Sequence, residues 1–204
     1  MSRISGIVLA VALVSLGAIS VTPAVAGPMD QPGYVKAMTC SACHGVSGNS
    51  RSEAVPILAG LPPAYFKKAI EDYATGKRVS AEMEPFAKQV KLLGVDEVAA
   101  FFAAQRREAT PIKADRAAVE RGRAAARECA TCHGAQGQGG QGDPGKLGPA
   151  IAGQPAAYLK NQLLLFKADK RSPGDEPLTK MKAVLKGIPD DTLGDVAAYY
   201  SSLR

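Results

Sequence analysis

Histidine and cysteine are scarce in this 204-residue sequence, which contains two histidines and four cysteines. All six lie in two copies of one short motif, C-x-x-C-H, at residues 40–44 and 129–133. If the two cysteines and the histidine of each motif all bind the same group, no cysteine remains for a structural disulfide or for a separate zinc site. No histidine then remains to act as a general base. These absences narrow the range of functions more than any other feature of the composition.

Long apolar runs are also rare, and the clearest one lies at the amino end. Arg3 precedes an apolar stretch at residues 4–21, and the small residues Ala-Val-Ala occupy positions 24–26. A positive start, an apolar centre and a small-residue cleavage site are typical of a secretory signal peptide. The stretch is nearly long enough to span a bilayer, so a retained membrane anchor is the alternative. We expect residues 1–26 to be removed and the mature protein to be periplasmic.

The C-x-x-C-H motif is typical of covalent attachment of a c-type haem. For one copy, a zinc half-site or a redox dithiol is an alternative, but two copies with matching flanks favour haem. We therefore expect two covalently bound haem c groups, with His44 and His133 as iron ligands on one side of each ring. Because no further histidine exists, a bis-histidine haem is excluded. The predicted attachment residues are Cys40, Cys43, Cys129 and Cys132.

The formal net charge of the sequence is +6 at pH 7, and removal of residues 1–26 would take away Arg3 and leave 24 basic against 19 acidic side chains, a net charge of +5. Such a balance can indicate a protein that binds nucleic acid. Two haems, however, bring four propionate carboxylates, which nearly cancel this charge. We therefore expect a solvated surface with a mild bias toward acidic partners, and no binding of nucleic acid.

The remainder of the sequence is two copies of one unit. A segment P-x-x-A-G-x-P-x-A-Y begins at Pro56 and again at Pro149. The offset between the copies grows along the chain, so the second copy has the longer loops. A short linker near residues 106–113 separates the copies, and we expect domains at 27–108 and 109–204. One departure from the repeat is Leu61, where the second copy has Gln154.

Apolar residues recur at helical spacing in both copies, and no segment alternates at the period of a strand. Glycines Gly33 and Gly122 each lie seven residues before the first cysteine of a motif. Glycine costs about 1 kcal/mol relative to alanine inside a helix, so the matched pair indicates close contact between helices. Each unit is small for a hydrophobic core of its own, and a haem acts as an apolar plate for its helices. The helical faces are Val95, Val98, Ala99 and Phe102, and Leu193, Val196, Ala197 and Tyr200.

The second axial ligand of each iron is expected to be a methionine, Met83 in the first unit and Met181 in the second. Met181 is the only methionine of the second unit, and it coincides with Met83 in the repeat. A lone methionine is more often a filler of the core, but this pairing favours ligation. Met38 lies too close to Cys40 to reach the opposite face of the ring.

The surroundings of the iron ligands also follow from the repeat. An axial imidazole usually donates a hydrogen bond from its other ring nitrogen to a carbonyl. The carbonyls of Pro56 and Pro149 are the candidate acceptors. The alternative is that both prolines only form turns and have no such role. Two further equivalent residues, Arg78 and Arg171, are either partners of haem propionates or ordinary surface arginines.

Taken together, the two haem motifs, the repeated proline-rich segment and the two methionines resemble dihaem class I cytochromes of the cytochrome c4 family. The resemblance covers essentially all of residues 27–204. It implies an all-α fold of two tandem class I cytochrome c domains related by internal duplication. It also implies a periplasmic electron carrier, in some cases membrane-associated, with redox partners such as a cytochrome bc complex and a terminal oxidase.

The leading interpretation is an electron-transfer protein, not an enzyme. One alternative is a fixed cytochrome subunit of a dehydrogenase or oxidase complex. The other is a dihaem peroxidase, which needs an open iron position and usually an acid–base group beside it. The sequence argues against the peroxidase, because it has no spare histidine and offers a methionine for each haem.

Overall fold

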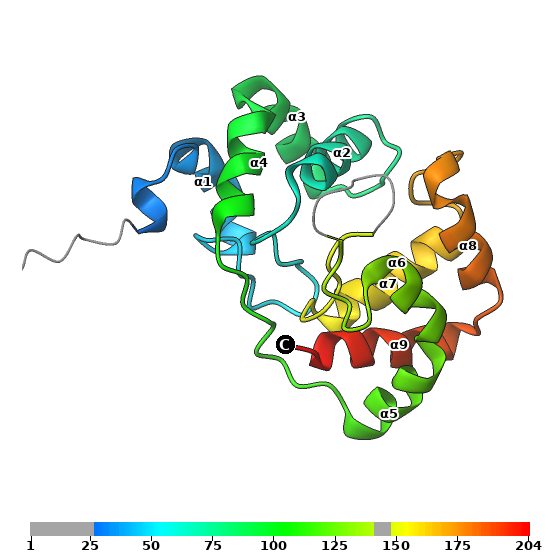
Figure 1. The fold of residues 1–204 in the computed structure, drawn as a ribbon. Coiled ribbons are helices and arrows are strands. Elements are labelled where there is room, and N and C mark those ends of the chain that lie inside the picture. The colour runs from blue at the N-terminus through cyan, green and yellow to red at the C-terminus, as the bar shows by residue number, and fades with distance from the viewer. Residues whose placement is uncertain (1–26, 141–147) are drawn as a thin grey trace, which may run out of the picture.

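The computed structural model describes residues 27–140 and 148–204, and the predicted signal peptide at residues 1–26 lies outside them. The helices form two groups on opposite sides of the molecule, joined by an extended segment after α4 (Figure 1). The first group contains η1 (Pro28–Asp30), α1 (Tyr34–His44), α2 (Pro63–Ala74), α3 (Met83–Leu93) and α4 (Val95–Ala104). The second contains α5 (Arg116–Ala125), η2 (Arg127–Cys129), α6 (Ala130–His133), α7 (Ala156–Lys167), η3 (Glu176–Leu178), α8 (Thr179–Lys186) and α9 (Asp190–Ser202).

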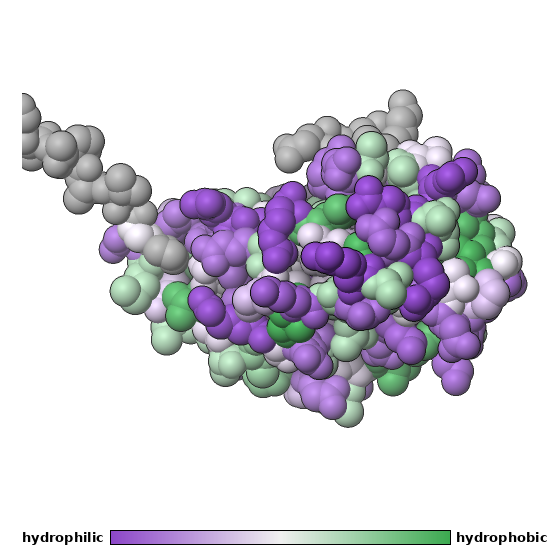
Figure 2. Space-filling model, turned by 90° about the horizontal axis from the view of Figure 1, so that it is seen from below, coloured by the Kyte–Doolittle hydropathy of each residue, from purple (hydrophilic) through white to green (hydrophobic). Residues whose placement is uncertain are grey.

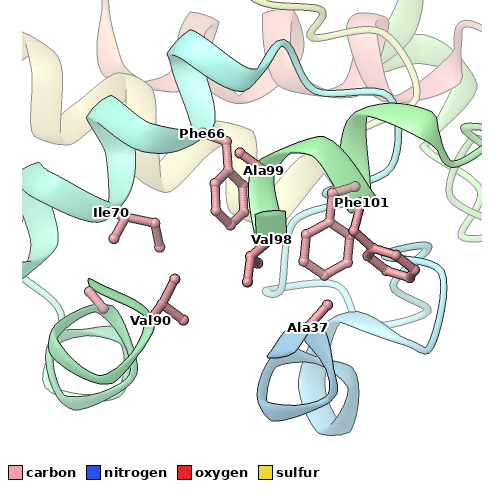
Figure 3. Close-up of a cluster of buried hydrophobic side chains, with 9 residues drawn as sticks. Ala37, Phe66, Ile70, Val90, Val98, Ala99 and Phe101 are labelled. Carbon is pink, nitrogen blue, oxygen red and sulfur yellow. The ribbon is translucent and has the colours of Figure 1, made fainter. Parts of the chain in front are cut away.

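In the first group, α2, α3 and α4 pack on one another and α1 packs across α4. Their shared core is rich in aromatic side chains (Figure 3), with the rings of Phe101 and Phe102 edge to face at 5.1 Å between centroids. The predicted apolar face of α4 is confirmed: Val98, Ala99 and Phe102 are buried, and Val95 is partly buried against the same core.

The second group has a similar plan, in which α9 packs against α5 and α7, and α8 packs against α7. The predicted face of α9 is also confirmed, with all four of its residues buried. The helix before the second motif is shorter than in the first unit: α5 ends at Ala125, and the motif itself lies on η2 and α6. The outer face of this group, around α5 and α9, is mainly hydrophilic with small separate hydrophobic patches (Figure 2).

Both predicted contact glycines lie where helices cross. A Cβ atom at Gly122 would lie 1.9 Å from the carbonyl oxygen of Asp195 in α9. A Cβ atom at Gly33 would lie 2.4 Å from the carbonyl oxygen of Glu97 in α4, and Gly33 also has a positive φ of 84°. The prediction of close helix contact is therefore confirmed in both units.

In the described ranges the structure contains no extended strand, only an isolated bridge between Arg78 and Arg171. Nor does any helix within these ranges have the length and apolar character that crossing a membrane requires.

Candidate functional site

The first C-x-x-C-H motif lies in the last turns of α1. Cys40 packs partly against the aromatic core, whereas Cys43 is exposed. Burial raises the pKa of the Cys40 thiol. Helical spacing places the two sulfur atoms about one turn apart along α1, which suits addition to the two vinyl groups of one ring.

The second motif has a similar arrangement on η2 and α6. Cys129 packs partly against the core formed by α5, α7 and α9, and burial raises the pKa of its thiol. Cys132 and His133 lie on α6, and the imidazole of His133 is buried. Gly148 passes so close to this imidazole that a Cβ atom at position 148 would lie 2.4 Å from its Cε1 atom. Only glycine therefore lets the backbone run against the ring.

Both histidines are oriented by the predicted carbonyls. The Nδ1 atom of His44 lies 2.8 Å from the carbonyl oxygen of Pro56, and that of His133 lies 2.8 Å from the carbonyl oxygen of Pro149. A carbonyl only accepts, so Nδ1 must carry the proton in each ring. This tautomer leaves the Nε2 lone pair for a metal. The prediction that these prolines accept from the histidines is confirmed.

The environment also keeps both imidazoles neutral near pH 7. Burial is the largest cause that lowers the pKa of His44; the bond to Pro56 opposes it, and the charge of Arg78 lowers the pKa further. Burial likewise lowers the pKa of His133. A neutral imidazole is the form that binds a metal.

The two predicted methionines lie in the first turns of equivalent helices. Met83 is the first residue of α3, and its amide donates to the Ser80 hydroxyl at 3.2 Å. Met181 lies in the first turn of α8 and packs against the core around Phe166. Both side chains are half-buried, while Met38 lies on α1 itself and is 52% exposed. The structure thus places Met83 and Met181 alike, as the repeat predicts.

The two equivalent arginines are not surface residues, since Arg78 is 4% exposed and Arg171 6% exposed. Arg78 donates to the Tyr158 hydroxyl at 2.9 Å, and Arg171 donates to the Tyr65 hydroxyl at 2.9 Å. Both also donate to the Gln162 side-chain oxygen, at 2.8 and 2.7 Å. The interpretation as ordinary surface arginines is therefore wrong.

These buried guanidiniums leave donors unused. Within the described part of the chain, the Nε atoms of Arg78 and Arg171 and one Nη atom of Arg107 are buried without a hydrogen-bond partner. The two equivalent arginines donate their side-chain bonds there only to neutral oxygens. Buried cations require anionic partners, and haem propionates are carboxylates. The residues present therefore fit a pair of haems, for which Arg78 and Arg171 would be cationic partners of the propionate carboxylates.

One polar residue that bridges the two units escaped the sequence analysis. The buried Gln154 accepts from the Ile57 amide and donates to the Ile57 carbonyl, both at 2.8 Å. The only signal in the sequence was the mismatch with Leu61 in the repeat. Nearby, the Tyr158 amide donates to the Glu53 carbonyl at 3.1 Å.

Comparison with known proteins gives consistent matches. The Cytochrome c family model matches residues 119–204. The chain is 32% identical to a thiosulfate dehydrogenase electron acceptor of Stutzerimonas stutzeri, over 82% of this chain and 80% of that protein. It is 30% identical to cytochrome c4 of Pseudomonas aeruginosa, over 84% of this chain and 87% of that protein.

The structure is similar to that of reduced cytochrome c4 from Pseudomonas stutzeri. The TM-score is 0.72 with 27% identity, and the match covers 84% of this chain and 97% of the other. The expected fold, all-α with two tandem class I cytochrome c domains, is thereby confirmed.

Proposed function

The chain belongs to the cytochrome c4 family of dihaem electron-transfer proteins, and on this premise we propose that it is a periplasmic carrier in a respiratory chain. Electrons pass from a cytochrome bc complex or a dehydrogenase to a terminal oxidase. Residues 1–26 are a signal peptide in this proposal, and the domain boundary lies between residues 108 and 109. Peripheral association with the membrane is compatible with this role.

The proposal assigns each haem to one unit. Cys40 and Cys43 would hold the first haem, and His44 and Met83 would ligate its iron. The equivalent residues of the second haem are Cys129, Cys132, His133 and Met181. Bound haem supplies an iron that changes between the ferric and ferrous states by one electron.

The chain's own residues prepare this chemistry. The carbonyls of Pro56 and Pro149 accept hydrogen bonds from the Nδ1–H groups of the two histidines, which fixes the rings and makes Nε2 more basic. Two fixed axial ligands favour electron transfer over binding of an external ligand. The buried Arg78 and Arg171 would supply positive charge to the propionates of bound haem.

The observation that carries the proposal is the histidine–proline hydrogen bond, which is present in both units with a length of 2.8 Å. The proposal is tested by mixing the reduced, purified protein with membranes that contain a terminal oxidase and recording the haem absorption and oxygen uptake. We expect rapid reoxidation of both haems, sensitive to inhibitors of the oxidase. Reoxidation no faster than without membranes would refute the pathway.

The match to thiosulfate dehydrogenase electron acceptors supports a second candidate, in which this chain accepts electrons from such a dehydrogenase. Mixing the oxidised protein with thiosulfate dehydrogenase and thiosulfate tests it, with haem reduction as the readout. Gel filtration of native extract separates a free carrier, which elutes alone, from a fixed subunit, which elutes with its complex.

A further inference from the structure

We infer that Gln154, a residue of the second unit, is a positioning residue for the first haem, acting through Ile57 and Pro56 on His44. The inference rests on the proposed ligation of iron by His44. It adds a route by which the second domain influences the potential of the first haem.

The contact is a two-point bond between buried groups. The Gln154 side chain engages both the amide and the carbonyl of Ile57, at 2.8 Å each, so the peptide groups on either side of Ile57 are held. Ile57 is 0% exposed and Gln154 is 4% exposed. Bonds between fully buried groups are costly to lose, because water does not replace them.

The held segment is the one that orients the histidine. The amide of Ile57 belongs to the same peptide group as the carbonyl of Pro56. That carbonyl is the acceptor for Nδ1 of His44. A bond to the amide nitrogen of this peptide group therefore fixes the direction of the carbonyl toward the imidazole. The Tyr158–Glu53 bond fastens the same loop to the start of α7 at a second place.

The second unit holds its own loop differently. The Gly148 amide donates to the Cys132 carbonyl at 2.7 Å, and the Gly140 amide donates to the Gly148 carbonyl at 3.2 Å. These bonds lie within the second unit, next to Pro149. The repeat position of Gln154 in the first unit is Leu61, which has no hydrogen-bonding side chain. Among the residues that the structure describes, the support that His44 receives from across the contact therefore has no counterpart of the same chemistry for His133.

The consequence is a potential that depends on the neighbouring domain. A firm Nδ1–H bond makes the imidazole a stronger donor, which favours ferric iron and lowers the potential. Loosening the Pro56 carbonyl should therefore raise the potential of the first haem and leave that of the second unchanged.

The test replaces Gln154 by the residue of the first repeat, Gln154→Leu, in the full dihaem protein. Haem methyl NMR signals followed through a redox titration report the potential of each haem. Exchange of the His44 and His133 Nδ1 protons is measured in the reduced, diamagnetic form. We expect the first haem's potential to rise, and the His44 proton to exchange about tenfold faster, as loss of one buried hydrogen bond implies. The signals of His133 should not change.

The matched control is Ser172→Ala, which removes another buried bond between the units, from the Ser172 hydroxyl to Asp72 at 2.7 Å. It should lower stability without shifting either potential. If Gln154→Leu does not fold, Gln154→Asn, one methylene shorter, takes its place. Equal shifts for both haems, or unchanged His44 exchange, would overturn the inference. A wild-type spectrum without two low-spin haems would instead refute the proposed ligation.

Discussion

Arg78 and Arg171, equivalent in the two repeats, pair with each other through an isolated antiparallel bridge. Their side chains reach the opposite units in a reciprocal manner, Arg78 to Tyr158 and Arg171 to Tyr65. Each guanidinium also lies over an aromatic ring of its own unit, at 4.4 Å from Tyr73 and 4.2 Å from Phe166. These reciprocal contacts match the internal duplication of the sequence.

This arrangement predicts how Tyr65 titrates. Burial is the largest single cause and raises its pKa, but the charges and hydrogen bonds of Arg171 and Arg78 together outweigh burial and lower the pKa to about 8. If propionates neutralise the arginines, they remove the field that favours the phenolate. We therefore expect the pKa of Tyr65 to lie above 8 in the dihaem protein.

NMR of the reduced protein with 13C-labelled tyrosine measures this pKa, with Tyr65→Phe identifying the signal. Arg171→Gln, which removes one of the two cations, should raise the pKa of Tyr65 further. Titration of Tyr65 near pH 8 in the wild-type protein would show that the arginines have no anionic partner.

Covalent attachment predicts the mass of the mature protein. We expect a chain that begins at Gly27 and carries about two haem masses, since each motif attaches one haem. Intact mass spectrometry of the exported protein checks both parts. One haem mass would contradict the use of both motifs, and a retained amino-terminal segment would contradict cleavage.

Axial ligation by methionine predicts a spectroscopic signature. The ferric protein should show the weak near-infrared sulfur-to-iron band for two haems. Met181→Ala should remove about half of this band, because one of the two haems loses its sulfur ligand, and should let external ligands bind one iron. Met38→Ala is the control and should leave the band unchanged. A full band in Met181→Ala would show that another group ligates the second iron.

The close crossing of α5 and α9 predicts that replacing a helical glycine by alanine destabilises this protein. In most helices glycine to alanine is stabilising by up to about 1 kcal/mol. Gly122→Ala should instead lower the free energy of unfolding by about 1 to 3 kcal/mol, as overpacking does, because its Cβ would overlap the Asp195 carbonyl.

Gly194→Ala is the matched control on α9. A Cβ there meets nothing closer than 3.6 Å, from the Lys160 side chain, so this variant should be neutral or more stable. Denaturant unfolding of both variants makes the comparison. If Gly122→Ala were as stable as the wild type, the close contact between α5 and α9 would not be needed for stability.

Much of the site follows from the sequence, because its signals are local or repeated. Spacing within a motif places Cys40, Cys43 and His44 on one helix. The repeat identifies Met83 with Met181 and predicts the roles of the Pro56 and Pro149 carbonyls. Helical periodicity finds the buried faces of α4 and α9, since a helix presents every third or fourth residue to the same neighbour.

The contact between the two units was decided only by the tertiary structure. Gln154 and Ile57 lie 97 positions apart, and no periodicity links residues that belong to different packing units. The burial of Arg78 and Arg171 likewise depends on how the second unit covers the first. A long polar side chain has the same local pattern on a surface as in an interface. Its partners, and hence its role, are fixed only when the two folded units meet.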